Sequence, residues 1–161
     1  DVEYTVIPDR IAAATYLCCA AVTGGEILLQ NVIPAHLSAI YPVLEELGCT
    51  LKTGEDSIAL QAPERLRPIK LVRTMPYPGF PTDAQAPMLA LACLADGTSV
   101  FVENIFESRY KQVAELSRMG VQVKIECRVV DVVCGESLHG ASVICYDLRA
   151  STTRVSPFLK A

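Results

Sequence analysis

The sequence predicts a mixed α/β fold built from one structural unit that occurs twice. Residues 4–62 and 71–133 share the same order of features: a short β-branched stretch ending near a proline, an Ala/Leu-rich segment, a glycine turn and an apolar strand. Gly25 and Gly97 are separated by the same number of residues as Gly48 and Gly120. Such spacing is typical of an internal repeat, and it predicts the order β-α-β-α-β-β for each unit.

The elements of the first unit follow from local signals. Prolines cannot donate to a strand ladder and mark strand ends. Aspartate before an apolar segment caps a helix, and glycine after one ends it. The predicted elements are a strand at Tyr4–Ile7, a helix capped by Asp9 that runs through Ala21, a strand at Ile27–Val32, a helix at His36–Leu47 ended by Gly48, and two strands joined by the turn at Thr53–Asp56.

The second unit repeats these signals. The strand Thr98–Ile105 is predicted from its apolar, β-branched composition, and the helix Tyr110–Met119 from the spacing of its apolar residues. The predicted elements are a strand at Lys70–Arg73, a helix capped by Thr82 or Asp83 that runs through Ala95, the strand Thr98–Ile105, the helix Tyr110–Met119 ended by Gly120, and two closing strands.

A third unit begins near the end of the chain. Ser142–Tyr146 resembles an opening strand, and Asp147–Ala150 resembles Asp9–Ala12. The following residues 151–161 contain Pro157 and two threonines, which are poor helix formers. We therefore expect a single partial lobe, with units at about 1–66 and 67–138 and an incomplete third unit at 139–161. An uncovered apolar face would then favour self-association.

Composition narrows the class of protein. A net charge of −4 argues against nucleic acid as a partner. The longest apolar stretch, Ile11–Val22, is too short to span a bilayer, and no secretory signal is visible, so a cytoplasmic protein is expected. Seven cysteines without a CxxC pair, and two distant histidines, favour free thiols over a metal site. We interpret Cys18 and Cys19 as packing residues of a helix. No cofactor or metal is expected.

Four segments make the sequence specific: FPTD (Phe80–Asp83), ENIFESRY (Glu103–Tyr110), ELSRMG (Glu115–Gly120) and YDLRA (Tyr146–Ala150). Together they resemble the UDP-N-acetylglucosamine 1-carboxyvinyltransferase family of enolpyruvyl transferases, over residues 1 to about 150. The resemblance implies a lobe that is an inside-out α/β barrel of three β-α-β-α-β-β units. It also implies transfer of the enolpyruvyl group of phosphoenolpyruvate to the 3′-hydroxyl of UDP-N-acetylglucosamine in peptidoglycan synthesis, and hence in cell-wall biogenesis, cell shape and division.

The resemblance also implies site residues. Asp83 would bind the sugar hydroxyl and take its proton, Arg109 and Arg149 would stabilise charge in the cleft, and Ile105 and Phe106 would border the nucleotide sugar. Each has a simpler interpretation from the residues alone. Asp83 caps a helix, the arginines pair with Glu107 or Asp147 at the surface, and Phe106 belongs to the core. Asp9 and Arg10, at the equivalent repeat position, either line the same cleft edge or form a local cap with an ion pair.

Three functions stay open at this point: the transferase named above, a related transferase and a non-catalytic binding module. In the family, the reactive loop and the groups that hold phosphoenolpyruvate belong to a second lobe, so we expect this chain alone to be inactive. The related enzyme of aromatic biosynthesis, 3-phosphoshikimate 1-carboxyvinyltransferase, shares fold and reaction but takes shikimate 3-phosphate. A non-catalytic module that binds a nucleotide sugar is the third possibility. The choice of ligand distinguishes them.

Overall fold

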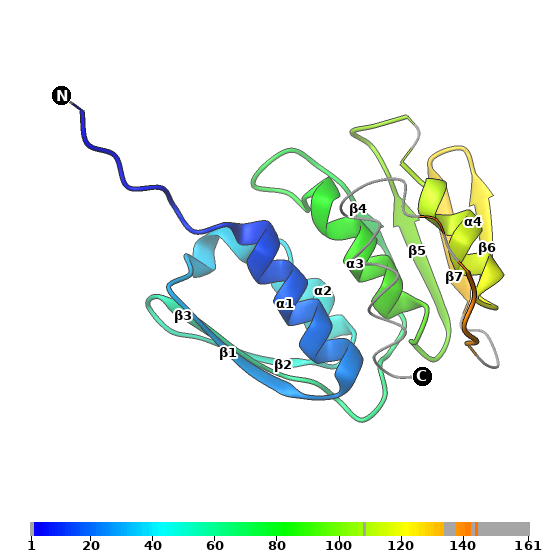
Figure 1. Ribbon diagram of the computed structural model, residues 1–161, viewed down its shortest axis with the longest axis horizontal. Coiled ribbons are helices and arrows are strands. Elements are labelled where there is room, and N and C mark those ends of the chain that lie inside the picture. Colours follow the sequence, from blue (N-terminus) through cyan, green and yellow to red (C-terminus); the bar gives the residue numbers. More distant parts are fainter. Residues whose placement is uncertain (1, 108, 134–137, 143, 145–161) are drawn as a thin grey trace.

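The computed structural model describes residues 2–107, 109–133, 138–142 and 144, and its elements form two β-sheets with helices packed against them (Figure 1). The first sheet has the order β1-β3-β2 and is antiparallel throughout, with Glu26 opposite Gln61. It contains β1 (Glu26–Gln30), β2 (Thr50–Thr53) and β3 (Ser57–Gln61), and its helices are α1 (Arg10–Thr23), the short 3₁₀ helix η1 (Pro34–Leu37) and α2 (Tyr41–Glu46).

The second sheet repeats this arrangement and adds one strand. Its order is β4-β5-β7-β6, in which β5-β7-β6 corresponds to β1-β3-β2. The extra strand β4 pairs in parallel with β5, with Val72 opposite Phe101. The elements are β4 (Val72–Arg73), α3 (Thr82–Ala92), β5 (Thr98–Val102), α4 (Lys111–Arg118), β6 (Gln122–Glu126) and β7 (Val129–Val133). The shared order confirms the mixed α/β fold and the internal repeat.

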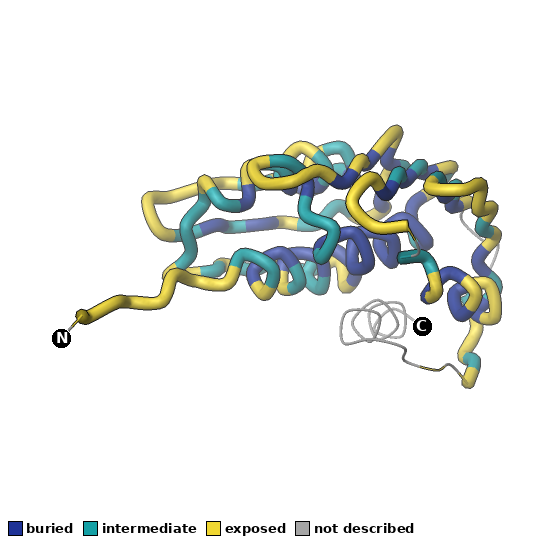
Figure 2. The backbone as a smooth tube through the Cα atoms, turned by 90° about the horizontal axis from the view of Figure 1, so that it is seen from above, coloured by how far each residue is buried: buried dark blue, intermediate teal, exposed yellow. Residues whose placement is uncertain are grey.

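Helices α1 and α3 lie side by side and join the two sheets into one core (Figures 1 and 2). The buried face of α1 includes Ala14, Leu17 and Ala21, and α3 is buried along its length from Ala84 to Ala92. A helix that is apolar on all sides belongs inside a protein. The N-terminal ends of the two helices lie toward the same edge of the molecule (Figure 1).

Local signals correctly predict the cap of α1 and the glycines that end the second helix of each unit. The Asp9 carboxylate accepts hydrogen bonds from the backbone N–H groups of Ile11 and Ala12, at 2.7 and 3.3 Å, which confirms the predicted cap of α1. Gly48 and Gly120 have φ angles of 97° and 94°. Such angles favour glycine, and they confirm the residues at which the second helix of each unit stops.

The strand predicted at Tyr4–Ile7 is wrong. The residues from Val2 to Ile7 form no β-ladder in the structure, and Val2 and Val6 are 96% and 81% exposed. The segment leaves the body of the protein ahead of α1 (Figure 1). Strand composition is not sufficient, because a strand is held by a neighbouring strand and by burial of one face. The first unit therefore starts at its helix, as α-β-α-β-β.

The helix predicted at His36–Leu47 is two shorter helices, η1 and α2. Pro42 lacks the N–H that would donate to the carbonyl of Ser38 in a continuous helix, so the chain restarts with proline in the first turn of α2. Several strands are also shorter than predicted. β1 ends at Gln30, β4 contains only Val72 and Arg73, and β5 ends at Val102. Only Ser142 and Ile144 of the predicted opening strand of a third unit are among the described residues, and residues 145–161 lie outside them.

The cysteines are mostly packing residues. Cys18, Cys49 and Cys93 are buried free thiols, Cys19 is half-buried and Cys127 is exposed. Burial raises the pKa of the Cys18 thiol well above its ordinary range and that of Cys49 to about 11. The prediction is thus confirmed for Cys18 and holds in part for Cys19. Over the described part of the chain, no helix combines the length and the apolar character that a bilayer crossing requires.

Candidate active site

A tight loop between β4 and α3 brings the FPTD segment to the edge of the second sheet. The backbone N–H of Met75 donates to the carbonyl of Phe80 at 3.0 Å, and Thr74 and Phe80 form a parallel bridge. Gly79 allows this closure, since a Cβ atom at that position would lie 2.5 Å from the Cβ of Met75. The loop therefore places Thr74 and Thr82 on the same side of the strand end.

The residue before α3 is Pro81, and no side chain caps the helix. The prediction that Thr82 or Asp83 acts as the cap is therefore wrong. Both residues lie in the first helical turn, and their side chains bind other elements instead. The Thr82 hydroxyl donates to Glu103 at 2.8 Å, and Asp83 pairs with Arg109. Their polar groups therefore bind residues that follow β5 instead of the backbone of α3.

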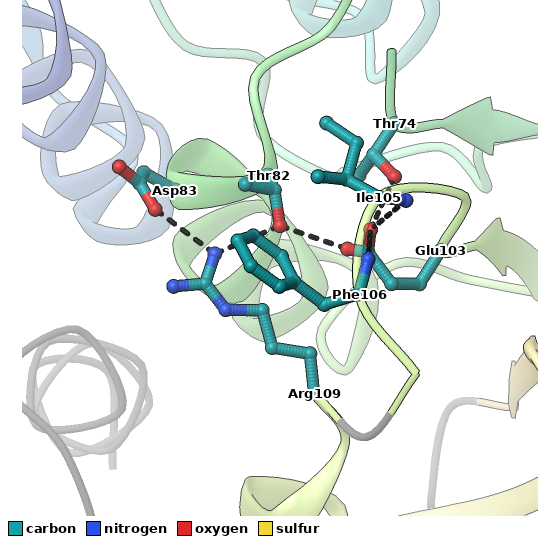
Figure 3. Close-up of polar contacts among 7 residues, drawn as sticks. All are labelled: Thr74, Thr82, Asp83, Glu103, Ile105, Phe106 and Arg109. Carbon is teal, nitrogen blue, oxygen red and sulfur yellow. Dashed lines mark hydrogen bonds and ion pairs between the residues drawn. The ribbon is translucent and has the colours of Figure 1, made fainter. Parts of the chain in front are cut away.

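Asp83 and Arg109 form the centre of the site (Figure 3). The distance between Arg109 Nη1 and Asp83 Oδ1 is 2.9 Å, and the same nitrogen donates to the Thr82 hydroxyl at 2.8 Å. The guanidinium carbon also lies 4.7 Å from the centre of the Phe106 ring. Both charged side chains are 26% exposed. The structure thus brings together Asp83, Arg109 and Phe106, which the sequence predicted as site residues.

Arg109 keeps part of its hydrogen-bonding capacity for a ligand. Only Nη1 is bound, and Nε and Nη2 make no hydrogen bond to any residue in the described ranges. A guanidinium has five N–H donors in a fixed fork that suits carboxylate and phosphate oxygens. Arg109 is therefore oriented by the protein through one nitrogen and offers its remaining donors to an anion.

Ile105 and Phe106 are exposed at the end of β5. Their exposed fractions are 39% and 48%, which rules out the interpretation that Phe106 is a core residue. Their backbone N–H groups are both bound to Glu103, at 2.7 and 3.1 Å. Apolar side chains held at the surface beside a polar pair are suited to contact the flat faces of a ligand.

Glu103 is a further residue of the candidate site that the sequence did not predict. Glu103 directly follows β5, and the residue is only 1% exposed. Four donors bind its carboxylate: the hydroxyls of Thr74 and Thr82 and the backbone N–H groups of Ile105 and Phe106. Burial alone would raise the pKa of this carboxyl, but the hydrogen bonds outweigh burial and lower it. One signal in the sequence could have indicated Glu103: it is a charged residue that directly follows a buried strand, and it lies inside the ENIFESRY segment.

Among the other predicted residues that the structure describes, Asp9 and Arg10 do not join this centre. Arg149 lies outside the described residues. Asp9 caps α1, while Arg10 stacks over the Tyr77 ring at 4.8 Å and lines a separate hollow of about 420 Å³ with His36. Glu107 lies 3.8 Å from Arg128, so the proposed surface pair between Glu107 and Arg109 is wrong. Within the described residues no cluster of His, Cys, Asp and Glu could hold a metal ion.

The fold and the site define a class of protein. The structure matches that of the enolpyruvyl transferase NikO from Streptomyces tendae with a TM-score of 0.84 and 23% identity, covering 98% of this chain and 38% of that one. It matches an EPSP synthase from Acinetobacter baumannii with a TM-score of 0.67 and 19% identity, covering 96% of this chain and 40% of that one. The chain thus has the fold of part of an enolpyruvyl transferase.

A sequence model of the EPSP synthase (3-phosphoshikimate 1-carboxyvinyltransferase) family matches residues 1–155. The chain therefore belongs to this family. Its relatives include proteins named UDP-N-acetylglucosamine 1-carboxyvinyltransferase from Symbiobacterium thermophilum, Desulfofundulus thermocisternus and Campylobacter jejuni, at 48%, 48% and 43% identity over 99% of this chain. The chain spans 36%, 65% and 38% of the length of these three relatives.

Proposed function

We propose that this chain forms the acceptor-binding part of a UDP-N-acetylglucosamine 1-carboxyvinyltransferase. Such an enzyme moves the enolpyruvyl group of phosphoenolpyruvate to the 3′-hydroxyl of UDP-N-acetylglucosamine and releases phosphate. The observation that carries this proposal is the pairing of Asp83 with Arg109 beside the exposed Phe106 ring. Relatives at 43–48% identity are named for UDP-N-acetylglucosamine, which supports this acceptor.

The proposed chemistry assigns Asp83 to the acceptor hydroxyl. A sugar hydroxyl becomes a good nucleophile when a base within hydrogen-bond reach accepts its proton. Its oxygen then adds to the carbon of phosphoenolpyruvate that carries the phosphate, while the methylene carbon takes up a proton. Loss of a proton from that carbon restores the double bond, breaks the bond to the phosphate oxygen and releases phosphate, which carries away the proton that Asp83 accepted. Asp83 is suited to this role because it is partly exposed and held by Arg109.

Arg109 would stabilise the anionic groups that meet at this point. Phosphoenolpyruvate brings a carboxylate and a phosphate. The Nε and Nη2 donors of Arg109, to which no described residue is hydrogen-bonded, match such oxygens. Ile105 and Phe106 would border the uracil and sugar of the nucleotide. Arg149 would add a second positive charge, as the YDLRA segment implies. We place the reaction in peptidoglycan synthesis in the cytoplasm, and we expect this chain to need a second lobe for activity.

The family description leaves a second acceptor to be tested, since it names 3-phosphoshikimate. The relatives at 43–48% identity favour the nucleotide sugar, and an exposed apolar surface at Ile105 and Phe106 suits a nucleobase better than it suits a small, highly charged shikimate phosphate. Activity with one acceptor or with the other therefore distinguishes the two functions.

The test is phosphate release by a complete transferase that carries this chain. We expect release from phosphoenolpyruvate with UDP-N-acetylglucosamine and none with shikimate 3-phosphate. The variant Asp83→Asn should lower kcat by roughly 10²-fold or more, which is the usual contribution of a general base. Asp96→Asn is the matched control, because Asp96 is an exposed carboxylate just beyond the opposite end of α3. Full activity of Asp83→Asn, or release with shikimate 3-phosphate alone, would overturn the proposal.

A further inference from the structure

We infer that Glu103 is a positioning residue which, acting through the Thr82 hydroxyl, orients Arg109 and Asp83 for the reaction. The inference rests on the proposed function and deepens it, because Glu103 touches neither of the two charged residues itself. It stands three residues before Phe106, at the end of β5, and it faces Thr74 and Thr82 from the β4–α3 segment (Figure 3).

Within the part of the chain that the structure describes, the carboxylate of Glu103 is buried without a charged partner. Its Oε1 accepts hydrogen bonds from Thr74 Oγ1 at 2.7 Å and from the N–H groups of Ile105 and Phe106, and its Oε2 accepts one from Thr82 at 2.8 Å. No cation pairs with it among the residues that the structure describes. A buried charge is costly, and a neutral side chain of the same shape would cost less. The negative charge itself is therefore the feature that needs an explanation.

The charge fixes the direction of a chain of hydrogen bonds. An ionised carboxylate can only accept, and a threonine hydroxyl has one proton to donate. Thr82 must therefore donate to Glu103, so only its lone pairs face the Nη1 donor of Arg109, 2.8 Å away. The bonds run from Arg109 to Thr82 to Glu103 in one sense. The lowered pKa of Glu103 supports a group that stays ionised at neutral pH.

A second route leads from the same carboxylate to Arg109. Oε1 binds the backbone N–H of Phe106 at 3.1 Å, and the Phe106 ring lies beneath the Arg109 guanidinium at 4.7 Å. Glu103 thus holds both the hydroxyl and the ring that contact Arg109. Since Arg109 is in turn bound to Asp83 at 2.9 Å, the position of the proposed base depends on a residue that does not touch it.

The first test reverses the hydrogen bond between Thr82 and Glu103 and keeps the shape of the residue 103 side chain. In Glu103→Gln the amide oxygen can still accept from Thr74, Ile105 and Phe106, but the amide NH₂ must donate to Thr82. We expect kcat of the complete transferase to fall roughly tenfold to a hundredfold, with a much smaller change in KM for UDP-N-acetylglucosamine. Thr82→Val should cause a similar loss, while Thr82→Ser, which keeps the hydroxyl, should restore most of the activity.

The double variant Glu103→Gln/Thr82→Val separates positioning from general stability. If the two residues act through one chain of bonds, the double variant should be no slower than the slower single variant. Three results would each overturn the inference. In the first, the losses in kcat of the two single variants multiply in the double variant. In the others, Thr82→Ser is as slow as Thr82→Val, or Glu103→Gln keeps its full kcat. Melting temperatures show whether a variant has failed to fold, and the threonine pair keeps the test decisive if Glu103→Gln does so.

A measurement without turnover keeps this inference distinct from the proposed function. In the isotope-labelled 161-residue chain, the guanidinium protons of Arg109 should give slowly rotating, resolved signals because Nη1 is bound twice. Thr82→Val should average these signals and Thr82→Ser should keep them. Averaged signals in the unmutated chain would contradict the role of Glu103. If these signals are resolved but the transferase ignores UDP-N-acetylglucosamine, it is the proposed function that fails.

Discussion

The guanidinium of Arg109 is bound to the carboxylate of Asp83 across a separation of 26 residues, with 2.9 Å between Nη1 and Oδ1. One residue follows the end of β5, and the other lies in the first turn of α3. Asp83 belongs to a helix that is buried in the core, and Arg109 is also held by the Thr82 hydroxyl and the Phe106 ring. This relationship is the basis of the proposed site.

Replacing Arg109 by lysine should damage the site although the charge is kept. A lysine ammonium lacks the planar fork of five donors, so it cannot bind Thr82 and Asp83, lie flat on Phe106 and still present a pair of donors to an anion. We expect kcat/KM of a complete transferase to fall by roughly 10²-fold. Arg128→Lys is the control, since Arg128 is about half exposed and its partner Glu107 lies 3.8 Å away. Equal activity of the two variants would show that Arg109 is only a surface charge.

Because of Glu103, the free energy of unfolding should decrease as the pH falls into the acid range. Its pKa in the folded state lies below the ordinary value of 4.5. A carboxyl with a lowered folded-state pKa stabilises the fold above its unfolded value, and this contribution is lost as the pH falls through the folded pKa. The amide signals of Ile105 and Phe106 should therefore titrate with a midpoint below pH 4.5. A midpoint above that value would contradict the hydrogen-bonded, ionised carboxylate.

The β4–α3 loop should not tolerate a side chain at position 79. In Gly79→Ala the new Cβ would lie 2.5 Å from the Cβ of Met75 and 3.0 Å from the carbonyl of Pro76. Neither atom is at the end of a flexible side chain, so the backbone must shift. We expect a loss of about 1–3 kcal/mol in the free energy of unfolding, measured by denaturant titration.

Gly25→Ala is the matched control for that change. A Cβ at Gly25 would meet Thr23 Oγ1 at an ordinary 3.5 Å, so its effect on the unfolding free energy should stay within about 0.5 kcal/mol, as for typical surface substitutions. Equal effects of the two substitutions would mean that the loop is not as tightly closed as the structure shows.

Thiol reactivity should separate the cysteines by burial. Cys127 is exposed, whereas Cys18, Cys49 and Cys93 are buried, and burial raises the pKa of Cys49 to about 11. The thiolate is the reactive form, so a raised pKa and a lack of access both slow alkylation. Brief treatment of the native chain with iodoacetamide, followed by peptide mass spectrometry, should label Cys127 and leave these three thiols unmodified. Labelling of Cys18 at the rate of Cys127 would contradict the packing of α1.

Local chemistry made a large part of the fold predictable from sequence. The cap at Asp9 and the stops at Gly48 and Gly120 depend on a few neighbouring residues, and the structure confirms them. The failures at Tyr4–Ile7 and at the break before Pro42 have different causes. A strand needs a partner that composition does not reveal, whereas the missing N–H of Pro42 was visible in the sequence but was outweighed by the apolar spacing.

The site was predictable only where a motif carried it. Asp83, Arg109, Ile105 and Phe106 came from the FPTD and ENIFESRY segments, while their contacts did not. Thr74 and Glu103 are 29 residues apart in sequence, and no local pattern predicts the parallel pairing of β4 with β5 that brings them together. The same dependence on distant contacts explains why Thr82 and Asp83 look like capping residues in the sequence but bind across the site in the structure.

The most direct test of the central claim is an NMR titration of the isotope-labelled chain with UDP-N-acetylglucosamine and, separately, with shikimate 3-phosphate. We predict amide shifts at Asp83, Ile105 and Phe106 with the nucleotide sugar and none with shikimate 3-phosphate. The same titration of Asp83→Asn should show weaker binding of the sugar with the fold intact. Shifts at these residues with shikimate 3-phosphate alone, or shifts by the nucleotide sugar that lie away from them, would contradict the claim that this site binds the acceptor.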